Sequence, residues 1–97
     1  MATYIALCKY TTEGVKSVKD APKRLDKAKA LARKLGGKMK EFYLTMGAYD
    51  VIAVYDLPDD DAAATFALMI GRTGAVSTVT LRAFPEADYR RLVKALR

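Results

Sequence analysis

Residues 38–57 read KMKEFYLTMGAYDVIAVYDL, a stretch dominated by aromatic and β-branched side chains. Two strands are predicted here, over residues 38–46 and 49–57, because such side chains favour the extended backbone of a half-buried sheet. The strands meet at Gly47-Ala48, which leaves room only for a tight turn. The stretch therefore predicts a β-hairpin in the middle of the chain.

A strand and a helix are predicted before the hairpin. Residues 3–10 alternate in side-chain character with the period of a strand. A short helical turn over residues 13–18 is expected next, followed by a main helix that begins at about Pro22 and is capped by Asp20. Two glycines, residues 36–37, end this helix.

A second helix and a fourth strand are predicted after the hairpin. Residues 59–61 are three aspartates, interpreted as a helix N-cap and two charges at the positive end of the helix dipole in preference to a metal site. The alanine-rich helix that they open ends at Gly71, and residues 75–84 form a strand. A last helix is predicted over residues 86–96. Its apolar residues, which are expected to be buried, are Leu92, Val93 and Leu96.

This order of elements, β-α-β-β-α-β plus a terminal helix, is typical of the ferredoxin-like arrangement in α+β proteins. Two right-handed crossovers would place both main helices on the same face of a four-stranded antiparallel sheet. A single domain over residues 1–97 is expected, because a chain of this length cannot divide its buried surface between two cores.

The composition excludes several kinds of chemistry. The chain has no histidine and one cysteine, Cys8. This removes Ser-His-Asp and Cys-His catalysis, the usual zinc sites and an internal disulfide, and no metal or cofactor is expected. The longest stretch without charge, residues 62–71, is too short to span a membrane, so no membrane partner is expected. The chain begins without an export signal, which predicts a cytoplasmic location.

The positive charge is concentrated in one segment. Residues 9–40 hold nine lysines and two arginines against three acidic residues, within a chain of net charge +6. Such a segment can attract phosphate groups. Apolar residues recur through it at helical spacing, however, which favours the solvated face of a helix. No specific nucleic-acid partner is therefore expected.

Strand alternation sorts the side chains into two faces. The aliphatic set, expected beneath the helices, comprises Ile5, Leu7, Ile52, Val54, Val79 and Leu81. The opposite set holds five of the six tyrosines, together with a buried filler, Cys8, and two charged residues, Glu41 and Arg82. So much aromatic surface on an open face predicts that something covers it. We expect a homo-oligomer, a dimer or larger, formed through this sheet face, with a pocket between the sheets for a small polar molecule.

Residues 44–50, LTMGAYD, together with residues 3–7 and 81–84, closely resemble the GYD-domain family over nearly the whole chain. The family is named for the motif found here as Gly47-x-Tyr49-Asp50. The resemblance implies membership of the dimeric α+β barrel superfamily, whose members are small and mostly homo-oligomeric. It implies no particular reaction, because a fold alone transfers no chemistry. Catalytic residues and enzymatic activity are therefore left open.

The motif has a structural and a functional interpretation. Gly47 offers the positive φ of a tight turn, and Asp50 can accept backbone N–H groups across that turn. Alternatively, Tyr49 presents its ring and hydroxyl to a ligand and Asp50 receives a ligand amine. The candidate ligand-binding residues are Tyr4, Tyr43, Tyr49, Asp50 and Arg82.

Three functions are compatible with these patterns. The leading prediction is a small-molecule binding domain, with cofactor-independent catalysis left open, that acts as a homo-oligomer. An RNA or single-stranded nucleic-acid binding module is the first alternative, because the RNA-recognition fold shares this strand order and stacks bases on sheet aromatics. The basic residues lie on the first helix, behind the sheet, which counts against it. An interaction or scaffold subunit without a ligand is the third.

Overall fold

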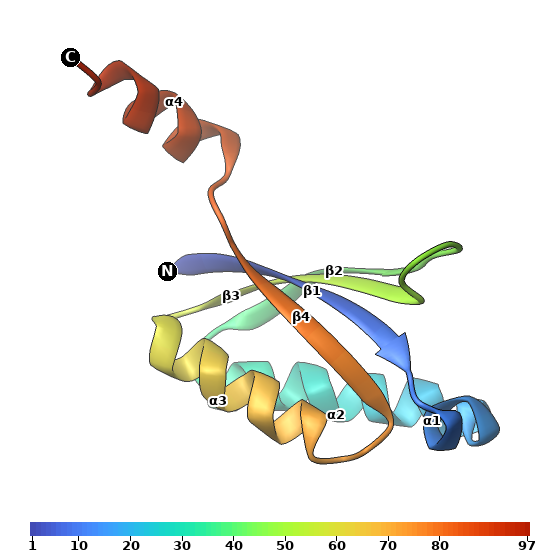
Figure 1. The fold of residues 1–97 in the computed structure, drawn as a ribbon. Helices are drawn as coiled ribbons and strands as arrows, with labels where there is room; N and C mark the ends of the chain where they lie inside the picture. Colours follow the sequence, from blue (N-terminus) through green and yellow to red (C-terminus); the bar gives the residue numbers. More distant parts are fainter.

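A four-stranded antiparallel sheet lies on two helices in the computed structural model, which describes residues 1–97 (Figure 1). The strand order is β2-β3-β1-β4, and every neighbouring pair is antiparallel. The strands are β1 (Ala2–Tyr10), β2 (Lys38–Leu44), β3 (Val51–Leu57) and β4 (Val76–Ala83). The predicted α+β, ferredoxin-like arrangement is confirmed.

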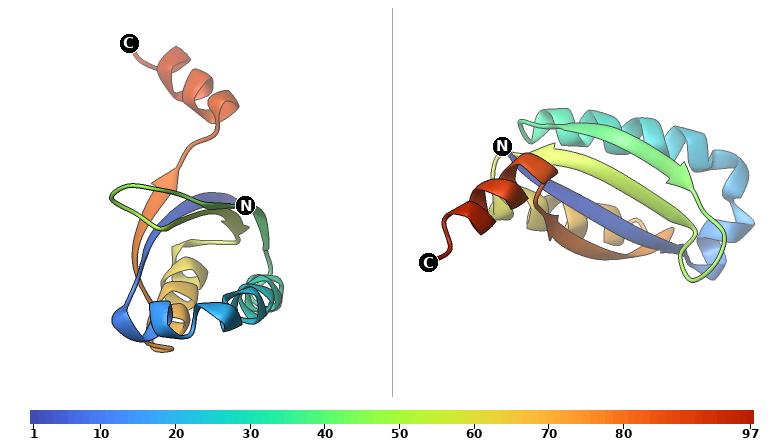
Figure 2. Two further views of the ribbon diagram at one scale, coloured as in Figure 1. Left: turned by 90° about the vertical axis from the view of Figure 1, so that its right-hand side faces the viewer. Right: turned by 90° about the horizontal axis from the view of Figure 1, so that it is seen from above.

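The two main helices cover the same face of the sheet, as the crossovers predict (Figures 1 and 2). The helices are α1 (Thr12–Lys16), the 3₁₀ turn η1 (Val18–Asp20), α2 (Ala21–Lys34), α3 (Asp60–Gly71) and α4 (Glu86–Lys94). Asp59 caps α3 as predicted, because its carboxylate accepts the Ala62 N–H at 2.9 Å. Asp20 stands at the N-cap of α2, but its side chain makes no capping hydrogen bond, since η1 leads directly into the helix.

The prediction of which sheet face lies beneath the helices is wrong. The aliphatic set lies on the open side, and the tyrosine-bearing set of β1 and β3 is packed under α2 and α3. Its buried members are Tyr4, Ala6, Cys8, Val51, Ala53, Tyr55 and Leu57. Tyr55 and Leu57 are the largest fully enclosed side chains of the chain. The core therefore lies between the two helices and the tyrosine-bearing face of the sheet.

The small side chains of the helices explain this inversion. α2 and α3 present alanines to the sheet, and Ala32 and Ala63 are buried there. Beside Ala32 and Ala63 there is room for large rings, and the Tyr55 ring of the sheet lies 4.8 Å from the Phe66 ring of α3, centroid to centroid. The Tyr4 hydroxyl satisfies its hydrogen-bonding need at the edge of the core by donating to the Asp60 carboxylate at 2.7 Å.

The other side of the sheet carries no helix, and we call it the open face (Figure 1). Two cross-strand rows form its centre, with Ile5 between Val54 and Leu81, and Leu7 between Ile52 and Val79. Tyr43 extends the second row, since it pairs with Ile52. Val79 and Leu81 are 46% and 44% exposed, so a continuous apolar surface faces outward.

The last helix, α4, projects away from the rest of the chain on the side of the open face (Figures 1 and 2). The apolar residues Leu92 and Val93 of this helix, and Leu96 just beyond it, were expected to be buried. This prediction is wrong, because they are 43%, 47% and 76% exposed. The chain leaves β4 through Pro85, whose extended backbone carries α4 beyond the sheet. The other face of the sheet offers α4 no place to pack, because α2 and α3 already cover it.

Candidate functional site

The GYD motif lies at the end of the hairpin and joins it to β1. Gly47 has φ 123°, the positive φ that the turn was predicted to need. The Asp50 carboxylate accepts the Tyr10 N–H at 2.9 Å, and its own N–H donates to the Cys8 carbonyl at 2.8 Å. Asp50 therefore accepts a backbone N–H, as predicted, but this N–H belongs to the neighbouring strand β1 and not to the turn. Both hairpin strands are shorter than predicted. Residues 45–50 form the turn instead, and the Thr45 N–H donates to the Asp50 carbonyl across it at 2.8 Å.

Tyr49 is half-buried in the turn before β3. Its carbonyl accepts the Thr45 hydroxyl at 2.6 Å, and the Lys9 ammonium lies 5.5 Å from the centre of its ring. The Tyr49 hydroxyl makes no hydrogen bond within the chain. Its ring and carbonyl therefore contribute to the turn, and its hydroxyl is not needed for it.

Replacing Asp50 with alanine is expected to lower the free energy of unfolding by about 2 kcal/mol, because the Tyr10 N–H loses a charged acceptor. Tyr49→Phe is the matched control in the same motif and should change stability by less than about 0.5 kcal/mol. Urea unfolding of the two variants measures both effects. An Asp50→Ala protein as stable as the wild type would contradict this role.

Tyr4 and Arg82 lie together at the other end of the sheet. They face each other across β1 and β4, and the Arg82 guanidinium lies 5.7 Å from the Tyr4 ring centre and 4.4 Å from that of Phe84. Arg82 donates hydrogen bonds to the carbonyls of Thr3 and Ala83. With Asp60 they border a shallow hollow of about 270 Å³.

The five predicted ligand-binding residues therefore occupy three places. Tyr4 and Arg82 form one pair, Tyr49 and Asp50 lie at the hairpin end, and Tyr43 lies on the open face, where its hydroxyl donates to Glu41 at 3.0 Å. The structure does not bring them into one pocket. Their role in ligand binding stays a prediction.

The Tyr4 hydroxyl makes the fold lose stability at alkaline pH. Burial, and then its hydrogen bond to Asp60, raise the pKa of Tyr4 from 10.0 to about 12. A raised tyrosine pKa means that the fold favours the protonated hydroxyl. The resulting stability is complete below pH 10 and is lost as the pH rises from 10 to about 12.

We expect the free energy of unfolding to fall over this pH range, and to fall less in Tyr4→Phe, which has no group to ionise at this position. Denaturant unfolding at neutral and at alkaline pH measures both proteins. Burial also raises the pKa of Tyr55, so Tyr55 adds to the alkaline loss of stability. Both proteins keep Tyr55, and the difference between them therefore reports on Tyr4 alone. Equal alkaline losses in the two proteins would contradict the assignment.

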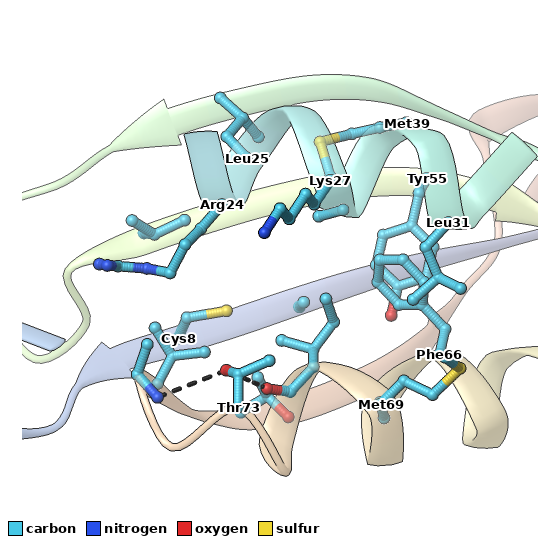
Figure 3. A pocket seen from close by; sticks show the side chains of 18 of the residues that line it. Cys8, Arg24, Leu25, Lys27, Leu31, Met39, Tyr55, Phe66, Met69 and Thr73 are labelled. Carbon is cyan, nitrogen blue, oxygen red and sulfur yellow. Dashed lines mark hydrogen bonds between the residues drawn. The ribbon is translucent and has the colours of Figure 1, made fainter. Parts of the chain in front are cut away.

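A cavity of about 540 Å³ lies between α2, α3 and the sheet (Figure 3). Seventeen of its 23 lining residues are hydrophobic, so it is suited to an apolar ligand. Leu31, Tyr55 and Phe66 lie at one end, whereas Cys8 and Thr73 lie toward the other (Figure 3). Burial raises the pKa of the Cys8 thiol, which agrees with its predicted role as a small apolar filler.

The charged residues that line this cavity are all basic: Arg24, Lys27 and Arg72. Arg24 donates to the Ser17 carbonyl at 3.1 Å and to the Gly14 carbonyl at 3.3 Å, which are neutral acceptors. None of the three ion pairs of the chain includes a lining residue. The cavity therefore carries positive charge that no carboxylate of the chain neutralises.

Sequence patterns did not point to this cavity. The basic residues of α2 were interpreted as a solvated face, although Arg24 and Lys27, three positions apart, share a side of the helix. A usable signal was the small residues on three elements that face one another, among them Ala6, Ala28 and Ala67. Small side chains on facing elements leave unfilled space.

Comparison with known proteins identifies the family. A family model described as the GYD domain matches residues 4–93. This chain belongs to the GYD-domain family. The resemblance inferred from Gly47, Tyr49 and Asp50 is thus confirmed.

Both a curated protein and a solved structure from Thermus thermophilus are similar to this chain. One, named "Glutamine synthetase and cystathionine beta-lyase binding protein", is 32% identical over 89 residues, which cover 91% of this chain and 94% of the relative. The crystal structure of TTHA0845 matches with a TM-score of 0.55 and 23% identity, over 87% of this chain and 94% of that one. The second likeness supports the shared fold alone.

No helix of this GYD protein combines the length and apolar character that crossing a membrane requires.

Proposed function

We propose that this GYD-domain protein is a binding subunit that associates with a second copy through its open face and docks onto another protein. The observation that carries the proposal is the open face itself. Ile5, Leu7, Ile52 and Val54 form its centre, and Val79 and Leu81 remain almost half exposed beside them. Contiguous apolar surfaces of this kind mark association sites in soluble proteins.

The position of α4 supports the same assembly. The helix has nine residues, fewer than the roughly 12 that an isolated helix needs for even marginal stability in water. Its apolar side chains Tyr89, Leu92 and Val93 recur at helical spacing on one face, and Leu96, just beyond the helix, continues that spacing. Because α4 projects on the side of the open face, a copy packed there would also lie near this helix (Figure 2).

The name of the Thermus relative supports a protein partner. That relative is named as a binding protein for glutamine synthetase and cystathionine β-lyase, and it is matched over 91% of this chain. We propose that this chain likewise binds an enzyme of amino-acid metabolism. Docking on an enzyme needs no reaction by the chain itself, so the proposed role is that of an interaction subunit.

The test is a titration of purified glutamine synthetase and cystathionine β-lyase, from the organism that carries this chain, against the immobilised protein. Saturable binding of at least one enzyme is expected in biolayer interferometry, and an unrelated enzyme of similar size should not bind. If neither enzyme binds, the proposed partner class is wrong. Self-association is measured separately, so the two parts of the proposal can fail independently.

The cavity favours a second function, the binding of a small molecule. Its volume of about 540 Å³ falls within the range of roughly 300–1,000 Å³ that is usual for ligand pockets. Nucleic-acid binding gains no comparable support, because Tyr4, Tyr10 and Tyr55 belong to the helix-facing register and are not available to stack bases on the open face.

A further inference from the structure

The cavity between α2, α3 and the sheet has an apolar end and a basic end. Leu31, Tyr55 and Phe66 form the apolar end, and Arg24 and Lys27 extend from α2 toward the end where Cys8 lies (Figure 3). This polarity along one cavity indicates a ligand with an apolar body and one charged group.

The sign of the charge that fits follows from the lining. The lining includes Arg24, Lys27 and Arg72 but no aspartate or glutamate. The Arg24 guanidinium is held by the neutral oxygens of Ser17 and Gly14, and Lys27 makes no hydrogen bond or ion pair within the chain. An anion placed beside an apolar wall would gain charge-assisted contacts that no side chain now supplies.

We propose that this cavity binds an amphipathic monocarboxylate, with its hydrocarbon body against Tyr55 and Phe66 and its carboxylate at Lys27. Arg24 and Arg72, which also line the cavity, add to its positive potential. This inference deepens the second proposed function, small-molecule binding, by naming the class of ligand. It does not depend on self-association, because every residue of the site belongs to one copy of the chain.

A helix α4 from a second copy is the competing occupant, since its face carries Leu92 and Val93. Charge complementarity is against it. The helix holds three basic residues, Arg90, Arg91 and Lys94, against two acidic ones, and Arg97 follows it. A basic helix would be repelled by the cations that line the cavity, whereas a carboxylate would be attracted to them.

The test is isothermal titration calorimetry of the full chain with octanoate, 1-octanol and octylammonium, three ligands that share one hydrocarbon chain. Octanoate should bind, 1-octanol should bind more weakly, and octylammonium should not bind. Lys27→Gln should weaken octanoate binding by about tenfold or more and leave 1-octanol binding unchanged. Lys23→Gln, a change of the same kind on α2 outside the lining, should leave octanoate binding unchanged.

A second variant locates the ligand. Ala28→Leu adds a larger apolar side chain to the cavity wall and should abolish the binding of both octanoate and 1-octanol. Equal binding of octanoate and 1-octanol, or equal loss in Lys27→Gln and Lys23→Gln, would overturn the carboxylate class while leaving small-molecule binding intact. If none of the three ligands binds the wild type, the carboxylate class and small-molecule binding at this cavity are both overturned. That result is the one expected if α4 of a second copy fills the cavity.

Discussion

Replacing Leu81 with aspartate should yield a folded protein that no longer self-associates. Leu81 is 44% exposed in the isolated chain, so a carboxylate at this position can remain hydrated and the fold should survive. In an assembly formed through the open face, the same carboxylate would be buried opposite Ile5 without a partner. Such a charge costs about 3–5 kcal/mol, which weakens association by about 100-fold or more.

Light scattering coupled to size-exclusion chromatography measures the mass of this variant, and circular dichroism measures its fold. Leu68→Asp is the matched control. Leu68 is 74% exposed on α3, on the opposite side of the sheet, so its replacement should leave both mass and fold unchanged. If Leu81→Asp keeps the mass of the wild-type assembly, the open face is not the contact.

Replacing Tyr55 with aspartate should instead unfold the protein. Tyr55 is 1% exposed, and its ring lies 4.8 Å from that of Phe66 and 5.9 Å from that of Tyr4. The change removes a large buried ring and places a carboxylate in its site. The combined cost of the lost packing and the buried charge exceeds about 5 kcal/mol, which is the whole stability of many domains of this size.

Tyr55→Phe is the control, since it keeps the ring and removes only the hydroxyl; it should cost about 1 kcal/mol. Circular dichroism and thermal unfolding distinguish the two outcomes. A folded, merely dissociated Tyr55→Asp protein would mean that Tyr55 faces a partner, as the alternation of the strands first suggested, and would contradict the core described here.

The succession of elements could be predicted from sequence because local signals determine it. Pro22 near the start of α2, the Asp59 cap of α3 and the Gly47 turn each restrict the backbone by short-range sterics or hydrogen bonds. The antiparallel sheet under two helices then follows from the right-handed crossovers. The family resemblance carried by Tyr49 and Asp50 depends on the same local stretch.

The choice of buried face could not be predicted, because both faces of these strands are apolar. Period-two alternation separates Tyr55 from Val54 but does not say which of them the helices cover. That choice depends on fitting the alanines of α2 and α3 to large rings, which is a property of three elements together. A sheet with two apolar faces is what a protein needs when one face packs on its own helices and the other on a second molecule.

The cavity and the projecting helix were missed for a related reason. Lys27 and Arg24 have the spacing of an ordinary solvated helix face, and only the tertiary structure places them beside an apolar space. Leu92 and Val93 have the spacing of an ordinary core helix, and only the path of the chain through Pro85 leaves them exposed. Amphipathic spacing indicates that a face will be covered but not by which molecule.

Sedimentation equilibrium of the unmodified protein, over concentrations from low to high micromolar, tests the proposed assembly most directly. The proposal predicts a mass that rises with concentration to at least twice the 10.7 kDa of one chain. It also predicts that Leu81→Asp remains at the mass of one chain over the same range. A wild-type protein that remains a monomer at high micromolar concentration would contradict it.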